Sequence, residues 1–176
     1  MILFFICELL IFLFMNQNSL IKYMGIVLCF LFCLYKQYFD FIFVIILFAD
    51  YLLLFTDLYE IGIFLFICVQ CLYHHILSHD YRFYFVLLLC IIPTIYSLSL
   101  CYAILSLMNI IQAYKQRHWL LITLLLLALC DLLIALQYLM HMNIPFIWYC
   151  YLPSQIYYVK MVLSHKIKPL NRQCNT

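Results

Sequence analysis

Two aspartates stand inside long apolar stretches of this sequence. Asp50 interrupts the apolar run 45–55, and Asp131 interrupts the run 124–135. An ionised carboxylate inside a lipid bilayer costs several kcal/mol, so such a residue is a candidate for function. Two carboxyl groups in one low-dielectric pocket would not ionise together, because desolvation and mutual repulsion keep one of them protonated. Such a pair can give a proton to a bond and activate a water molecule for hydrolysis.

The composition indicates that the elements around these aspartates lie in a membrane. Of the 176 residues, 70% are hydrophobic and only 9% are charged. A soluble domain of this length cannot bury so much apolar surface. We therefore expect an all-α protein, a polytopic transmembrane helix bundle in the cell membrane, of the kind found in bacterial plasma membranes. A net charge of +2 gives no reason to expect a nucleic-acid partner.

Seven apolar runs define the predicted helices. They cover residues 2–15, 20–35, 39–55, 61–77, 83–113, 119–140 and 144–163. The fifth run is too long for one span of about 20 residues. Pro93, followed by Ser97 and Ser99, offers a place where the chain can reverse. We therefore predict two short helices there, which makes eight spans in all.

The basic residues favour this topology. With eight spans, both termini lie on one side of the membrane, and seven of the nine Lys and Arg residues lie there with them: Lys36, Arg82, Lys115, Arg117, Lys166, Lys168 and Arg172. Basic residues collect on the cytoplasmic side of membrane proteins. The prediction is a single transmembrane domain over residues 1–163, a short basic tail over 164–176, and cytoplasmic N and C termini.

This topology predicts a polar pocket within the bilayer. At a helical rise of about 1.5 Å per residue, both aspartates lie roughly 17 Å from the cytoplasmic face. Gln70 and Gln155 are expected at a similar depth and Asn109 closer to the cytoplasmic side, and Pro153 is expected to interrupt the last span. The candidate binding residues are Gln70, Tyr73, Asn109, Tyr151 and Gln155. The alternative is structural, since buried amides also join transmembrane helices by hydrogen bonds.

Other groups are weaker candidates. Glu8 is a further carboxylate, in the first span. His74, His75, His79 and Asp80 cluster at the end of the fourth span, where histidines are usually solvated, so no metal site is predicted. Most of the ten cysteines fall in apolar runs, where a thiol behaves as a small hydrophobe, and the Cys68–Cys71 pair is best interpreted as packing.

Four segments in order resemble the YhhN-like lysoplasmalogenase family. They are FADYLLL at 48–54, GIFLF at 62–66 with Gln70 and Tyr73 after it, LCD at 129–131, and YLPSQ at 151–155. Members are eight-span membrane proteins. The resemblance implies hydrolysis of the vinyl ether bond of lysoplasmalogen, which yields a fatty aldehyde and glycerophosphoethanolamine or glycerophosphocholine.

The resemblance also implies roles for the residues. One aspartate, Asp50 or Asp131, protonates the enol ether, and the other stabilises the resulting cation and orients water. Gln70, Tyr73, Asn109 and Gln155 position the water and the glycerol backbone. Aromatic residues such as Trp148 and Tyr149 meet a cationic head group. This chemistry needs no cofactor or metal, and its partners are a lysophospholipid and the bilayer. Two departures are that Gln70 stands where the family often has His, and that the fifth and sixth spans are short.

Two other function classes stay open. A proton-coupled transporter of a small molecule or lipid would also use paired aspartates near the middle of the membrane. A non-catalytic membrane protein would use the same polar residues as structural contacts only.

Overall fold

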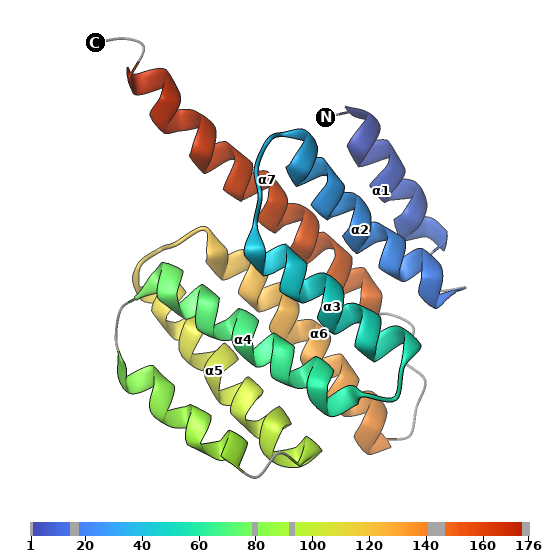
Figure 1. The fold of residues 1–176 in the computed structure, drawn as a ribbon, viewed down its shortest axis with the longest axis vertical. Coiled ribbons are helices and arrows are strands. Elements are labelled where there is room, and N and C mark those ends of the chain that lie inside the picture. The colour runs from blue at the N-terminus through green and yellow to red at the C-terminus, as the bar shows by residue number, and fades with distance from the viewer. Residues whose placement is uncertain (1, 15–17, 79–80, 92–93, 141–146, 174–176) are drawn as a thin grey trace. The chain divides into compact units, whose positions relative to one another are not determined.

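The structure, a computed structural model, describes residues 2–14, 18–78, 81–91, 94–140 and 147–173. Within these ranges the chain forms seven α-helices and one 3-10 helix, and no strand (Figure 1). The α-helices are α1 (Ile2–Phe14), α2 (Ser19–Tyr35), α3 (Phe41–Phe55), α4 (Tyr59–Leu77), α5 (Ile95–Lys115), α6 (Leu120–Met140) and α7 (Ile147–Gln173), and the 3-10 helix is η1 (Tyr81–Ile91).

The predicted division of the fifth apolar run is confirmed. The 3-10 helix ends at Ile91, and α5 begins at Ile95 after the N-cap Thr94. The Thr94 hydroxyl accepts a hydrogen bond from the Ser97 N–H, and the Ser97 hydroxyl accepts one from the Thr94 N–H. This reciprocal capping box starts a new helix. Because α5 then runs for 21 residues, the expectation of a short sixth span is wrong, and only η1, with 11 residues, is short.

Helix α7 differs from the prediction at two places. It continues through Pro153, so the expected interruption of the last span is wrong. A proline removes only one backbone donor, here the one that would bond the Tyr149 carbonyl oxygen. The Ser154 hydroxyl donates to a different carbonyl oxygen, that of Tyr151, at 2.6 Å. The helix also continues to Gln173, into the residues expected to form a separate tail.

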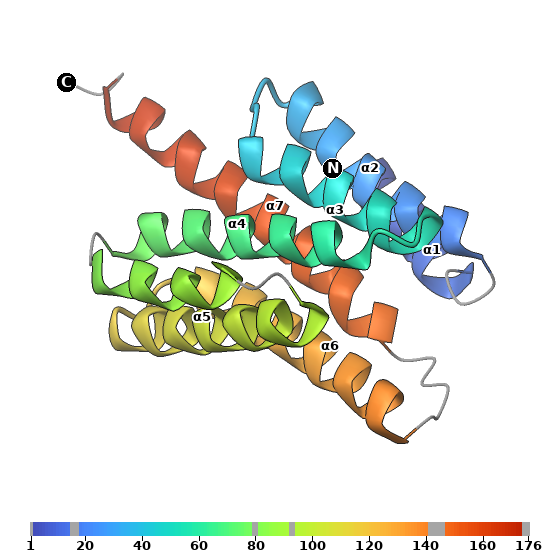
Figure 2. The same ribbon diagram turned by 60° about the horizontal axis from the view of Figure 1, so that its bottom comes forward.

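The chain divides into two compact units. The terminal unit comprises Met1–Asp40 and Leu129–Thr176, and the central unit comprises Phe41–Ala128. In the terminal unit α1, α2 and α7 lie side by side (Figures 1 and 2). Phe4 of α1 stacks on Phe32 of α2 at 4.1 Å between ring centroids. Gly25 of α2 lets α7 approach closely, because a Cβ there would lie 2.8 Å from Leu152 Cδ1.

In the central unit, α3 and α4 pack around Gly62. A Cβ on Gly62 would lie 2.7 Å from Leu53 Cδ2 and 3.5 Å from the Ala49 carbonyl oxygen. Small residues at such contacts let two transmembrane helices approach closely. Gly62 therefore sets the register of α3 against α4.

Helices α4 and α5 run parallel, because η1 returns the chain between them. In Figure 1 both run from lower right to upper left. A buried cluster joins the three elements, and its members are Ile67 of α4, Phe83 of η1, and Leu98, Cys101 and Leu105 of α5.

Three helical segments within the described residues are long and apolar enough to cross a membrane. They are Tyr59–Leu77, Ile95–Lys115 and Leu120–Gln137, while α1, α2 and α3 are shorter apolar helices. Large apolar side chains on these helices are exposed, among them Phe64, Leu107 and Leu125. An apolar exterior of this extent fits a membrane helix bundle.

The substitution Gly62→Val tests the close contact of α3 with α4. The added side chain must displace Leu53, and overpacking of this kind costs about 1–3 kcal/mol in the free energy of unfolding. Adding Leu53→Ala should restore part of that loss. The measurement is SDS-induced unfolding of the detergent-solubilised protein, followed by circular dichroism. Ile61→Val, at a neighbouring exposed position, is the control and should change stability by less than about 0.5 kcal/mol. Equal effects of the two single variants would contradict the contact.

Candidate functional site

A chain of polar side chains, three of them buried and one half-buried, joins α4 to α5, and we call it the α4–α5 polar chain. Its members are Gln70, His74, Tyr102 and Asn109. Asn109 Nδ2 donates to both the backbone carbonyl oxygen and Oε1 of Gln70, each at 2.8 Å. Asn109 Oδ1 lies 3.0 Å from His74 Nδ1, and Gln70 Nε2 donates to the Tyr102 hydroxyl at 3.4 Å. Asn109 is 0% exposed, so all of its hydrogen bonds are made inside the protein.

The spacing of these residues explains why they meet. Gln70 and His74 are four residues apart and share one face of α4, while Tyr102 and Asn109 are seven apart and share one face of α5. Since the two helices are parallel, successive turns of one contact successive turns of the other. The next contact along the pair is the hydrogen bond from Gln116 Nε2 to the Leu77 carbonyl oxygen, at 2.7 Å.

The expectation that His74 is solvated is wrong. The residue is 5% exposed, and its ring stacks on Phe83 of η1 with 3.7 Å between centroids and 6° between planes. Both Nδ2 bonds of Asn109 go to Gln70, so its Oδ1 is the acceptor and His74 Nδ1 must carry the proton between them. The signal in the sequence was the four-residue spacing from Gln70.

The structure describes only part of the predicted histidine cluster. His75 is exposed, and His79 and Asp80 lie outside the described residues. Among the residues that the structure describes, no group of three or more His, Cys, Asp or Glu is placed to hold a metal ion.

Asp50 lies on the buried face of α3. It is 3% exposed and follows the buried residues Ile46 and Ala49 on the same face. The register at Gly62 places Asp50 roughly 10 Å along the helix axis from Gln70, at 1.5 Å per residue. The Asp50 and Gln70 side chains therefore lie at different positions along the helix axis. Tyr73 is also fully buried in the central unit.

The remaining predicted site residues belong to the terminal unit. Asp131 is half-buried on α6, next to the buried Cys130. Tyr151 and Gln155 are buried on α7, as expected. Gln155 Nε2 donates to the Ser154 hydroxyl at 3.4 Å, whereas Gln155 Oε1 has no hydrogen-bond partner within the described part of the chain. That Asp50 and Asp131 meet in one pocket stays a prediction.

Two further polar contacts stabilise the terminal unit. The Cys29 thiol donates to Oε1 of the buried Glu8 at 3.4 Å, which joins α1 to α2. The Tyr158 hydroxyl donates to Asp40 Oδ2 at 2.9 Å, which fastens the α2–α3 connection to α7. Burial raises the pKa of Tyr38 in that connection, and the Asp40 carboxylate raises it further. Asp40 and Tyr158 were not predicted, because 118 residues separate them.

The aromatic residues expected to meet a cationic head group already have partners. Lys22 Nζ lies 5.5 Å from the centroid of the Trp148 ring, and Tyr151 packs against the same ring edge to face at 5.1 Å. Tyr149 packs against Phe12 of α1 at 4.7 Å. The cation on Trp148 is therefore the protein's own Lys22.

No protein-family model, curated protein or solved structure matches this chain. The resemblance to the YhhN-like family therefore stays a prediction from four short segments.

The substitution Asn109→Leu tests the α4–α5 polar chain. It leaves Gln70 Oε1 and His74 Nδ1 buried without their partner, which costs about 1–3 kcal/mol in the free energy of unfolding. The measurement is SDS-induced unfolding in detergent. The matched control is Gln112→Leu, a half-buried amide one turn along α5, which should cost less than about 0.5 kcal/mol. If both variants were equally stable, the polar chain would not join the helices.

Proposed function

We propose that this protein is a membrane-embedded hydrolase of the lysoplasmalogenase kind, which cleaves the vinyl ether bond of lysoplasmalogen. The observation that carries the proposal is Asp50, a carboxyl group that is 3% exposed on an otherwise apolar helix. An Asn would serve a purely structural role without the cost of ionisation, so a buried Asp favours proton chemistry. The four segments that resemble the family support the same substrate.

The proposal includes an eight-span topology with both termini cytoplasmic. Within the described residues, three helices have the length and hydropathy for crossing, and the distribution of basic residues supports the orientation. A lysolipid would then reach the site sideways from the bilayer.

The proposed reaction is acid-catalysed addition of water. Asp50 donates its proton to the outer carbon of the enol ether, which leaves an oxocarbenium ion on the carbon bonded to oxygen. Water adds to that carbon, and the proton it loses returns to the carboxylate. The resulting hemiacetal collapses to the fatty aldehyde and the glycerol hydroxyl. A second carboxylate, Asp131, would stabilise the cation and orient the water.

The amides divide between two roles in this proposal. Asn109 and Gln70 bond to each other, so they position α4 and α5 and do not contact the substrate. Gln155 Oε1 can accept a hydrogen bond from a water molecule or a glycerol hydroxyl. Tyr73 and Tyr151 are the proposed phenolic contacts.

Aldehyde release from lysoplasmenylethanolamine by the purified protein tests the proposal. Asp50→Asn should lower the rate by about 10²–10⁴-fold, the usual contribution of a general acid. Asp131→Asn should lower it as well. Asp57→Asn, at an exposed carboxylate after α3, is the control and should keep the wild-type rate. No aldehyde from a folded wild type, or full activity of Asp50→Asn, would overturn the proposal.

Proton-coupled transport is the second candidate function. It is favoured by two buried titratable groups of the central unit, Asp50 and His74, which lie at different levels along the helices. In transporters, Asp and His side chains at successive levels of the membrane pass protons from one to the next. Uptake of an intact lysolipid into proteoliposomes without aldehyde formation would favour transport over hydrolysis.

A further inference from the structure

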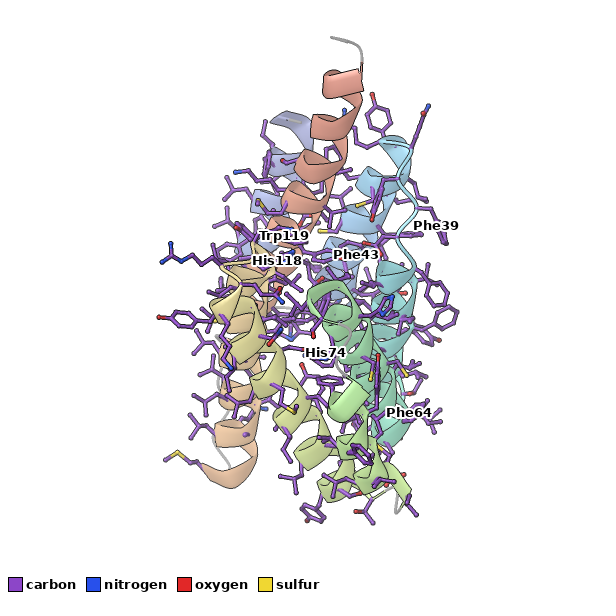
Figure 3. All side chains as sticks on the ribbon, turned by 90° about the vertical axis from the view of Figure 1, so that its left-hand side faces the viewer. Phe39, Phe43, Phe64, His74, His118 and Trp119 are labelled. Carbon is purple, nitrogen blue, oxygen red and sulfur yellow. The ribbon has the colours of Figure 1, made fainter. Side chains whose placement is uncertain are left out.

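The turn between α5 and α6 forms a basic surface depression of about 560 Å³. Its lining includes Lys115, Arg117, His118 and Trp119, with Leu121 and Ile122 of α6 on its apolar side. Figure 3 shows His118 and Trp119 at the end of the two helices. This lining suits an anionic amphiphile. The two cations, the imidazole and the indole can donate hydrogen bonds to an anionic head group, and the apolar side chains can contact its hydrocarbon chain.

Arg117 follows the end of α5 in a backbone conformation that favours glycine. Arg117 has a φ of 50°, and the hydrogen bonds from Arg117 N–H to the Tyr114 oxygen and from His118 N–H to the Ala113 oxygen form a Schellman motif. Glycine is the usual residue at this position because other residues are strained there. A glycine would relieve this strain, so Arg117→Gly removes the side chain while the turn is kept.

The same motif occurs at the end of α2, where Gln37 has a φ of 55°. The hydrogen bonds match, from Gln37 N–H to the Leu34 oxygen and from Tyr38 N–H to the Cys33 oxygen. An uncharged residue therefore suffices for the turn itself. The turn does not require the positive charge of Arg117.

The position of the turn indicates the chemical class of ligand that it would meet. Both α5 and the segment Leu120–Gln137 have the length and hydropathy to cross a membrane, so the turn between them lies at the level of the lipid head groups. Trp and Tyr residues are enriched at that level. Basic residues there attract anionic lipids.

We propose that this depression binds the phosphate of an anionic phospholipid. Arg117 and Lys115 meet the phosphate, and the start of an acyl chain lies along Ile122. His118 Nδ1 accepts a hydrogen bond from the Leu120 N–H at 3.3 Å, so the neutral ring carries its proton on Nε2 as a donor. This site is independent of the proposed hydrolysis.

Quenching of Trp119 fluorescence by brominated lipids tests the proposal. The chain has two tryptophans, so Trp148→Phe leaves Trp119 as the reporter. The protein is placed in phosphatidylcholine nanodiscs that contain the same mole fraction of acyl-brominated phosphatidylglycerol or acyl-brominated phosphatidylcholine. We expect several-fold stronger quenching by the phosphatidylglycerol. Removing one basic side chain, by Arg117→Gly or by Lys115→Gln, should lower this preference about fivefold.

The control is Gln37→Gly, which relieves the same backbone strain at the end of α2 and should keep the preference for phosphatidylglycerol. Equal quenching by the two brominated lipids would overturn the proposal, as would equal preferences in Arg117→Gly and Gln37→Gly. A final arm adds inorganic phosphate at constant ionic strength. Retained quenching supports a lipid ligand, whereas loss of the preference would assign the site to free phosphate and contradict the proposal.

Discussion

The side-chain amide of Asn109 is the interaction on which the central unit depends. One nitrogen donates twice to Gln70, and one oxygen accepts from His74, all away from solvent. A buried amide left without partners is costly, so α5 has few alternative positions along α4. Because the bonds join parallel helices, the chain must return between them, and η1 provides that return. The capping box at Thr94 and the stacking of Phe83 on His74 follow from the same constraint.

This arrangement separates two kinds of buried polar residue. Asn109 and Gln70 satisfy each other, which makes them part of the scaffold. Asp50 lies roughly 10 Å away along the axis, on a face of α3 set by the contact at Gly62. Asp50 lies at a different level along the helices from Asn109 and Gln70. Its carboxyl group can therefore change its protonation without breaking the hydrogen bonds that hold α4 to α5.

The sequence predicts the helices well and the contacts between them less well. Apolar runs bounded by polar residues locate the helices to within a few residues, except at the end of α7, which continues ten residues past the predicted run. Pro93 with its neighbouring serines locates the reversal. Burial of Asp50 follows from its apolar neighbours. The position of Gln70 along the helix axis relative to Asp50 does not follow from the sequence. The ends of the predicted spans do not determine the register of α3 against α4, whereas the close contact at Gly62 does. His74 was missed because its position near a helix end outweighed its spacing from Gln70. The bond between Asp40 and Tyr158 joins residues too far apart in the chain for any local pattern to indicate.

The protonation of His74 tests the central claim most directly. In protein labelled with ¹⁵N at histidine, the ring signals of His74 are assigned by comparison with His74→Gln. If Asn109 holds Gln70 and His74 together as described, the proton lies on Nδ1 and stays there in the neutral ring. A neutral ring with its proton on Nε2, or rapid exchange between the two nitrogens, would contradict the account, because the Asn109 amide would then be turned or unbound.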